Sequence, residues 1–181
     1  MGNQHQKASD MLTEDAFRQR LVTVHLNQRT HMWRIIEGIS AQDMTRRVSD
    51  EANNPSIVSI LRHTANAETY WMHKAGFGIA PPLKVDEVDA VLGQLKRITE
   101  ALKDTLRTCP AQQLRIQAPT EKTAPSIAWA VLRTSQHGIY HTGQIAKIRH
   151  MIGVPAVPAD DTLWGAAVDS IILLLRDTIQ S

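Results

Sequence analysis

Three histidines are the side chains in this sequence whose type and spacing could do chemistry. His137 and His141 stand four positions apart, so on a helix they leave the same face about 6 Å from each other. At that separation both imidazole rings can bind one metal ion, about 2.0–2.1 Å from each nitrogen. The pair alone is also typical of two histidines in a core or on a surface, so a third ligand is needed to indicate a site.

His63 can supply that third ligand. It lies on a predicted helix whose inward-facing stripe consists of Ile57, Ile60, His63, Ala67 and Trp71. If this helix packs beside the one that carries His137 and His141, three nitrogens meet across the seam. Three histidines with open positions are typical of a catalytic metal site, whereas a structural zinc site more often has four closed ligands that include cysteine. The pattern favours a divalent-metal site, with histidines that bind no metal as the alternative.

Most of the other histidines and the single cysteine are expected to be structural or solvated. His25 and His31 flank the inward stripe of the first predicted helix and are expected at the surface or its boundary. His150 falls in the last turn of its helix, where a positive charge suits the helix dipole. Cys109 has no histidine or acid beside it in a known catalytic arrangement and cannot form an internal disulfide, so we expect an inert thiol at a helix end.

Helical periodicity and chain breakers position these residues. The breaks predict five helices: from the cap Thr13 to Gly38, from Asn53-Asn54-Pro55-Ser56 to the loop at 76–82, from about Val85 to Leu106, from the cap Ser126 to Gly153, and from Asp161 or Thr162 through Leu175. The sequence has no alternating run of β-branched residues, the pattern that would indicate a sheet. We therefore predict an all-α fold, an antiparallel four-helix bundle with long connections and an additional C-terminal helix. It forms one domain over residues 1–181, with a flexible tail at 1–10.

The first helix is expected to face inward along one apolar stripe. The members of this stripe are Val22, Leu26, Arg29, Trp33 and Ile36. Trp33 and Trp71 are expected in the core, with the wall of a pocket as the alternative.

Composition argues against several classes of partner. The formal net charge is +2 and the Lys and Arg residues are spread thinly, so no nucleic-acid partner is expected. The longest strongly apolar run, residues 171–175, is far short of the roughly 20 residues that span a bilayer. The polar start lacks the apolar stretch of a signal peptide, so a cytoplasmic protein is expected. The expected partner is a small-molecule substrate. The apolar last helix favours either a homodimer or an added bundle layer.

Two segments resemble a known family. Residues 59–71, SILRHTANAETYW, resemble the second-helix signature of the DinB-like, or YfiT-like, metalloenzyme superfamily. Residues 137–145, HGIYHTGQI, resemble its fourth-helix signature. The resemblance implies a four-helix bundle that holds a divalent ion, zinc or nickel, at His63, His137 and His141. Related branches include S-transferases and isomerases that depend on the low-molecular-weight thiols bacillithiol or mycothiol, and many members have no established activity.

Three hypotheses for the function are open at this point. An ion held by three neutral imidazoles keeps its charge and acidifies a bound water or thiol, which would yield hydroxide for hydrolysis or thiolate for transfer. The resemblance favours a thiol-dependent S-transferase over a hydrolase. Because no separate nucleophile or general base is visible, a non-catalytic, metal-stabilised stress-response or binding module is the second hypothesis. Histidines without metal are the third.

A few side chains near the three histidines are candidates for supporting roles. Gln144 lies on nearly the same face as His137 and His141 and could orient a water or a ligand, with packing at the seam as the alternative. Tyr140 is offset around the helix and could donate a hydrogen bond, with a boundary position as the alternative. Glu68 falls about 140° around its helix from His63, so a helix–helix contact or a role behind the ligands suits it better than metal binding.

Overall fold

The structure, a computed structural model, describes residues 13–49, 55–78, 81–155, 157 and 161–179. This part of the chain is helical and contains no strand, which confirms the predicted all-α fold. The elements are α2 (Glu14–Ile36), α3 (Ala41–Thr45), α4 (Ile57–Lys74), α5 (Val88–Thr108), the 3-10 helix η1 (Ala111–Leu114), α6 (Ile127–Met151) and α7 (Asp161–Ile179). The predicted tail, residues 1–10, and Asn53 and Asn54 lie outside the described residues.

Local signals account for the main helix boundaries. Thr13, Ser56 and Ser126 each accept a hydrogen bond from a backbone N–H in the first turn of α2, α4 and α6. Gly38 and Gly153 follow the ends of α2 and α6 with φ of 73° and 75°, the left-handed region that favours glycine. These caps and stops lie where the sequence predicted them. The short elements α3 and η1 were not predicted, because four or five residues are too few to show a helical period.

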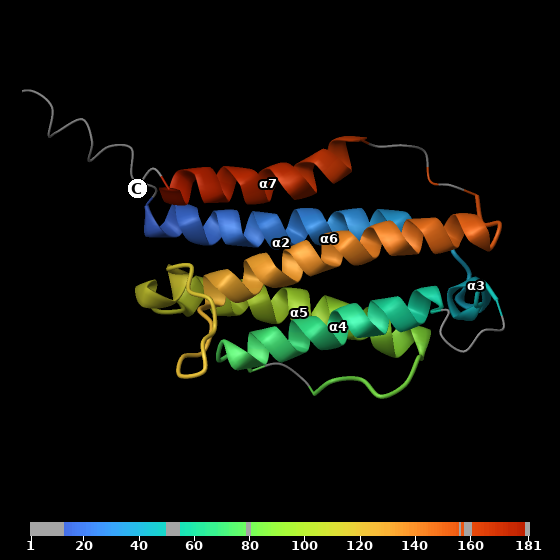
Figure 1. Ribbon diagram of the computed structural model, residues 1–181, viewed down its shortest axis with the longest axis horizontal. Coiled ribbons are helices and arrows are strands. Elements are labelled where there is room, and N and C mark those ends of the chain that lie inside the picture. The colour runs from blue at the N-terminus through green and yellow to red at the C-terminus, as the bar shows by residue number, and fades with distance from the viewer. Residues whose placement is uncertain (1–12, 50–54, 79–80, 156, 158–160, 180–181) are drawn as a thin grey trace, which may run out of the picture.

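Four helices pack side by side as a bundle and α7 lies against α2 (Figure 1). α2 and α6 run in one direction, while α4 and α5 run in the other, because the connection after α4 returns along the length of the bundle before α5 begins (Figure 1). α4 and α6 are therefore antiparallel neighbours. α7 is the additional C-terminal helix, and the Asn27 side chain of α2 donates to the backbone oxygen of Ala166 at 3.1 Å.

The core has two apolar clusters with buried polar residues between them. One cluster contains Leu21, Met72, Leu102 and Val131, and the other contains Met32, Leu61, Leu95 and Ile145. On each of the four helices, buried polar residues lie at or near the boundary between the two clusters. We use the name polar layer for eight of them: His25, Gln28, Arg29, Thr64, Glu68, Thr99, Thr134 and Ser135.

The polar layer is bonded across the bundle. Arg29 Nη2 donates to Glu68 Oε2 at 2.5 Å, which joins α2 to α4. His25 Nε2 lies 3.1 Å from Thr99 Oγ1, which joins α2 to α5. Glu68 thus makes the helix–helix contact that its position on α4 predicted. The prediction for His25 was wrong, since its side chain is 1 % exposed rather than at the surface.

The predicted inward stripe of α2 was also partly wrong. Arg29 and Ile36 are buried as predicted, but Val22, Leu26 and Trp33 are only half-buried. The reason is that α2 contacts α5, α6 and α7, so its buried face is wide and includes the polar residues His25 and Gln28. His31 is half-buried, at the boundary where it was expected.

Two further predictions concern Cys109 and the membrane. Cys109 lies buried at the end of α5, where Arg18 Nη1 donates to its Sγ at 3.1 Å. No helix in the described part of the chain combines the length and the apolarity needed to cross a bilayer.

Candidate metal centre

His63 on α4 and His137 and His141 on α6 meet where these two helices pack together. Each offers a ring nitrogen, and the three nitrogens lie within 4.8 Å of one another. The ring centroids are 4.3 Å apart for His137 and His141, and 5.1 Å and 4.9 Å from these two to His63. We call this group the histidine seam. The structure therefore brings together the three residues that the sequence singled out.

The closest pair of nitrogens has a spacing that suits a shared ion. His137 Nε2 and His141 Nε2 are 3.0 Å apart. Two nitrogens bound to one ion at 2.0–2.1 Å lie roughly 2.8–3.4 Å apart for octahedral to tetrahedral angles. His63 is exposed, so its ring can rotate toward the pair without disturbing the core. The donor set fits a divalent ion such as zinc or nickel, which imidazole nitrogen binds well.

Gln144 and Tyr140 hold the His141 ring. The Gln144 Oε1 atom lies 2.7 Å from His141 Nδ1 and, as an amide oxygen, can only accept. His141 Nδ1 therefore carries the proton, and its Nε2 presents a lone pair toward His137. Gln144 Nε2 in turn donates to Tyr140 Oη at 2.9 Å. Both residues thus act through His141, which is the support that metal-binding histidines usually receive.

Burial keeps the two α6 histidines neutral. Loss of solvation, together with the nearby His141, His63 and Arg133, lowers the pKa of His137 to about 4. Loss of solvation also lowers the pKa of His141, against the opposing effect of its bond to Gln144. A metal ligand must be unprotonated, so both rings are in the form that binds an ion at neutral pH.

The seam is open on one side. His141 is buried, His137 is half-buried and His63 is exposed. The prediction that His63 faces inward was wrong. The core face of α4 is formed by Ile57, Leu61, Thr64, Glu68 and Met72, among others. Of the stripe predicted from the sequence, Ile57 and Ile60 are buried as predicted, whereas Ala67 and Trp71 are only half-buried.

A close approach of α2 supports α6 behind the histidines. Gly138 follows His137 and faces α2, and a Cβ atom at this position would lie 2.3 Å from Gln28 Nε2. Only a residue without a side chain leaves room for Gln28 there. On the same turn, His137 Nδ1 is buried and has no hydrogen-bond partner among the described residues, while its Nε2 lies on the His141 side.

A pocket of about 260 Å³ adjoins the seam. Its lining residues are Val48, Pro55, Ile60, Gln144, Lys147, Ile148 and Met151. Gln144 is the residue that binds His141, and Ile60 precedes His63 by about one turn of α4. Sequence reasoning missed Lys147 as a possible site residue. The available signal was that Lys147 lies three positions after Gln144 on the same helix. The apolar residues that complete the pocket, Val48, Pro55 and Ile60, come from other segments of the chain.

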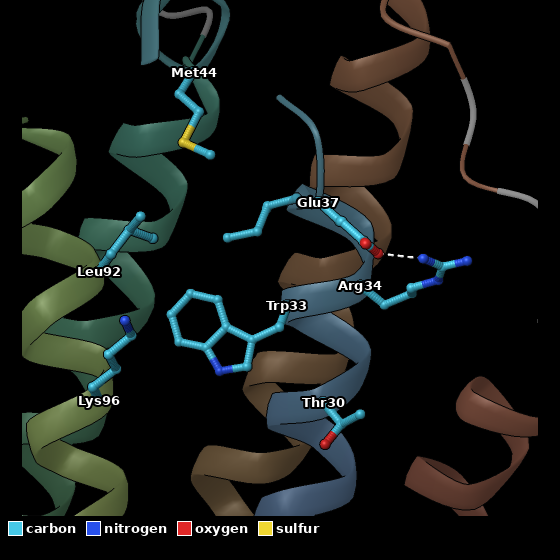
Figure 2. A pocket seen from close by; sticks show the side chains of 8 residues that line it. Thr30, Trp33, Arg34, Glu37, Met44, Leu92 and Lys96 are labelled. Atoms are coloured by element: carbon cyan, nitrogen blue, oxygen red, sulfur yellow. Dashed lines mark hydrogen bonds and ion pairs between the residues drawn. The ribbon is translucent and has the colours of Figure 1, made fainter. Parts of the chain in front are cut away.

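Two of the other hollows are lined by a tryptophan and lie away from the histidines. One of about 410 Å³ contains Tyr70, Trp71 and Lys74 beside residues 119–125. The other, of about 620 Å³, lies between α2, α3 and α5, and Figure 2 shows Trp33 extending from α2 toward Leu92 and Lys96 on α5. Both tryptophans are half-buried and line a hollow, which is the alternative to the core position expected for them. Neither hollow includes a residue of the histidine seam.

Comparison with known proteins places the chain in a family. The protein-family model of the DinB superfamily matches residues 26–145, more than half of the chain, and this range includes all three histidines. No curated protein and no solved structure matches the chain.

Proposed function

This chain belongs to the DinB superfamily, and from that membership and the histidine seam we propose that it is a metal-dependent enzyme acting on a small molecule. His63, His137 and His141 bind a divalent cation, zinc or nickel. The observation that carries the proposal is that three ring nitrogens from two helices lie within 4.8 Å of one another, with the His63 side exposed. A purely structural metal site would be closed by a fourth protein ligand, so the open side supports an enzyme over a non-catalytic module.

The residues around the seam have distinct roles in this proposal. A divalent ion bound there would supply a Lewis acid that lowers the pKa of a coordinated water or thiol. Gln144 fixes the His141 ring in the tautomer with a free Nε2, and Tyr140 fixes Gln144. The exposed side of His63 lets a small molecule approach.

Thiol-dependent S-transfer is the reaction we propose, ahead of hydrolysis. Hydrolytic zinc sites on helices commonly use a carboxylate as the general base for water, as in His-Glu-x-x-His motifs. Among the described residues, no carboxylate joins the three histidines, and the buried Glu68 of α4 is paired with Arg29. A thiol whose pKa is lowered loses its proton without such a base. The arrangement therefore favours a low-molecular-weight thiol as the nucleophile.

Metal content tests the binding site. We expect about one zinc or nickel ion per tag-free chain by elemental analysis, and loss of this metal in His63→Ala, His137→Ala and His141→Ala. His73→Ala and His150→Ala are matched controls, since they remove exposed histidines from α4 and α6 outside the seam. Metal retained in any two of the three seam variants would remove the proposed site.

A conjugation assay tests the reaction. The metal-loaded protein is incubated with bacillithiol, mycothiol, glutathione or cysteine and with 1-chloro-2,4-dinitrobenzene, and the conjugate is measured by mass spectrometry. In this reaction the thiol sulfur bonds to the ring carbon, chloride leaves, and the thiol proton goes to solvent. We expect one thiol to react faster with the wild type than with His141→Ala. If no thiol reacts, and 4-nitrophenyl acetate is cleaved only by the metal-loaded wild type, the activity is hydrolysis instead.

A further inference from the structure

We propose that the pocket lined by Ile60, Gln144 and Lys147 binds the substrate as a small carboxylic acid with an apolar body, and that Lys147 binds its carboxylate. This inference rests on the proposed function, because it names the substrate class of the same site. We call this hollow the seam pocket, and its full lining is Val48, Pro55, Ile60, Gln144, Lys147, Ile148 and Met151.

The seam pocket borders the histidine seam through two of its lining residues, Gln144 and Ile60. Gln144 is in its wall and lies 2.7 Å from His141 through the atoms Oε1 and Nδ1. On the facing helix, Ile60 is in the wall and His63 follows it by three positions, about one turn. A molecule in this pocket can therefore extend along the α4–α6 seam toward the three ring nitrogens. The hollows beside Trp71 and Trp33 share neither a seam histidine nor a hydrogen-bonding partner of one.

The lining selects a molecule with an apolar body. Five of its residues are apolar: Val48, Pro55, Ile60, Ile148 and Met151. The volume of about 260 Å³ is below the roughly 300–1,000 Å³ of pockets that enclose drug-sized ligands, so the occupant is small. Met151 is 52 % exposed, which leaves apolar surface that a ligand can cover.

Lys147 sets the charge that the pocket favours. It is exposed, and none of the described lining residues is acidic. Among the described residues, Lys147 forms no ion pair. Two helix ends also border the pocket: the positive N-terminal end of α4 at Pro55 and the negative C-terminal end of α6 at Met151. Because their dipoles oppose each other, Lys147 determines that the pocket favours a negatively charged ligand. One ammonium group suits a singly charged carboxylate, whereas phosphate sites usually combine several donors.

Hexanoate is a suitable probe, with 1-hexanol and hexylamine as probes of the same length. Their binding to zinc-loaded protein is measured by titration calorimetry. We expect hexanoate to bind tightest, and Lys147→Met to raise its Kd about three- to tenfold while leaving that of 1-hexanol unchanged. Lys96→Met is the matched control, because Lys96 is an exposed lysine that lines the other apolar hollow. Met151→Glu, at an exposed position, should also weaken hexanoate through charge repulsion.

The outcomes separate this inference from the proposed function. Hexanoate binding that is unchanged in both Lys147→Met and Met151→Glu would overturn the seam pocket, while a full metal content in these variants would leave the metal site standing. Binding that is lost in His137→Ala yet unchanged in Lys147→Met would assign the carboxylate to the ion and also overturn the role of Lys147. Hexyl phosphate that binds more tightly than hexanoate, with the same dependence on Lys147, would overturn the choice of a carboxylate.

Discussion

The polar layer and the histidine seam both hold ionisable side chains, in opposite settings. In the polar layer, Arg29 and Glu68 are 3 % and 0 % exposed and bind each other, and the buried His25 binds Thr99. In the seam, His63 is exposed and the three nitrogens converge with no described carboxylate among them. Histidine occurs in both. A structural histidine is therefore distinguished from a candidate ligand by the partner that its ring nitrogens meet and by whether solvent can reach the group.

The largest expected effect separates the two regions by stability. Arg29→Met should lower the free energy of unfolding by about 3–5 kcal/mol, because it leaves Glu68 buried without its partner. Burial already raises the pKa of Glu68, and Arg29 opposes that shift. Urea unfolding of the metal-free protein measures the change. Arg34→Met breaks the more exposed pair with Glu37 and should cost less than about 1 kcal/mol. Equal losses in both variants would contradict a structural role for the polar layer.

The next effect concerns the seam alone. Gln144→Ala should weaken zinc binding about 10–100-fold, because the His141 ring loses the acceptor for its Nδ1 proton. Its unfolding free energy without metal should change little, since Gln144 is only half-buried. Competition with a chelator measures the affinity. Gln136→Ala, at an exposed position on the same helix, is the control and should bind zinc as the wild type does.

A smaller effect follows from the buried histidine of the polar layer. Burial lowers the pKa of His25 well below its usual 6.5, and Arg29 and Lys103 add to the shift. Below pH 6.5 the unfolded chain binds a proton at His25 that the folded chain does not. The contribution of His25 to the free energy of unfolding is thus fully present above pH 6.5. It falls by up to about 1.4 kcal/mol per pH unit as the pH drops toward the folded-state pKa.

Unfolding of the metal-free protein at several pH values measures this slope. His25→Asn should reduce this slope by the contribution of one group, while the lowered pKa values of His31, His137 and His141 maintain the rest. His150→Gln, which replaces an exposed histidine, should leave it as in the wild type. A slope that is the same in His25→Asn and the wild type would show that His25 does not carry the effect.

The smallest effect compares two glycines of α6. Gly143→Ala meets open space and should raise the unfolding free energy by up to about 1 kcal/mol through helix propensity. Gly138→Ala places its Cβ against the buried Gln28 amide, so we expect it to be about 1–2 kcal/mol less stable than Gly143→Ala. Adding Gln28→Ala to Gly138→Ala should recover the difference. Equal stabilities of the two alanine variants would show that α2 yields at this contact.

The sequence predicts the helices better than their faces, for a physical reason. Capping at Thr13, Ser56 and Ser126 depends on residues within one turn, so the sequence alone predicts it correctly. Which side of α4 enters the core depends on α3, α5 and α6 together, so the side on which His63 lies was predicted wrongly. His25 was misplaced for a similar reason, because its partner Thr99 is 74 positions away.

The candidate site was predictable in part because its strongest signal is local. His137, His141 and Gln144 share one helix, and their spacing alone puts them on nearly one face. The seam pocket was not predictable, since Lys147 and Met151 meet Val48 and Pro55 only when distant segments fold together.

Anomalous diffraction at the zinc edge, from crystals of the zinc-loaded protein, tests the central claim most directly. We predict one peak between α4 and α6, about 2.0–2.1 Å from a nitrogen of each of His63, His137 and His141, with the remaining positions facing solvent. A peak elsewhere, or one closed by a fourth protein ligand, would contradict an open metal site at the histidine seam.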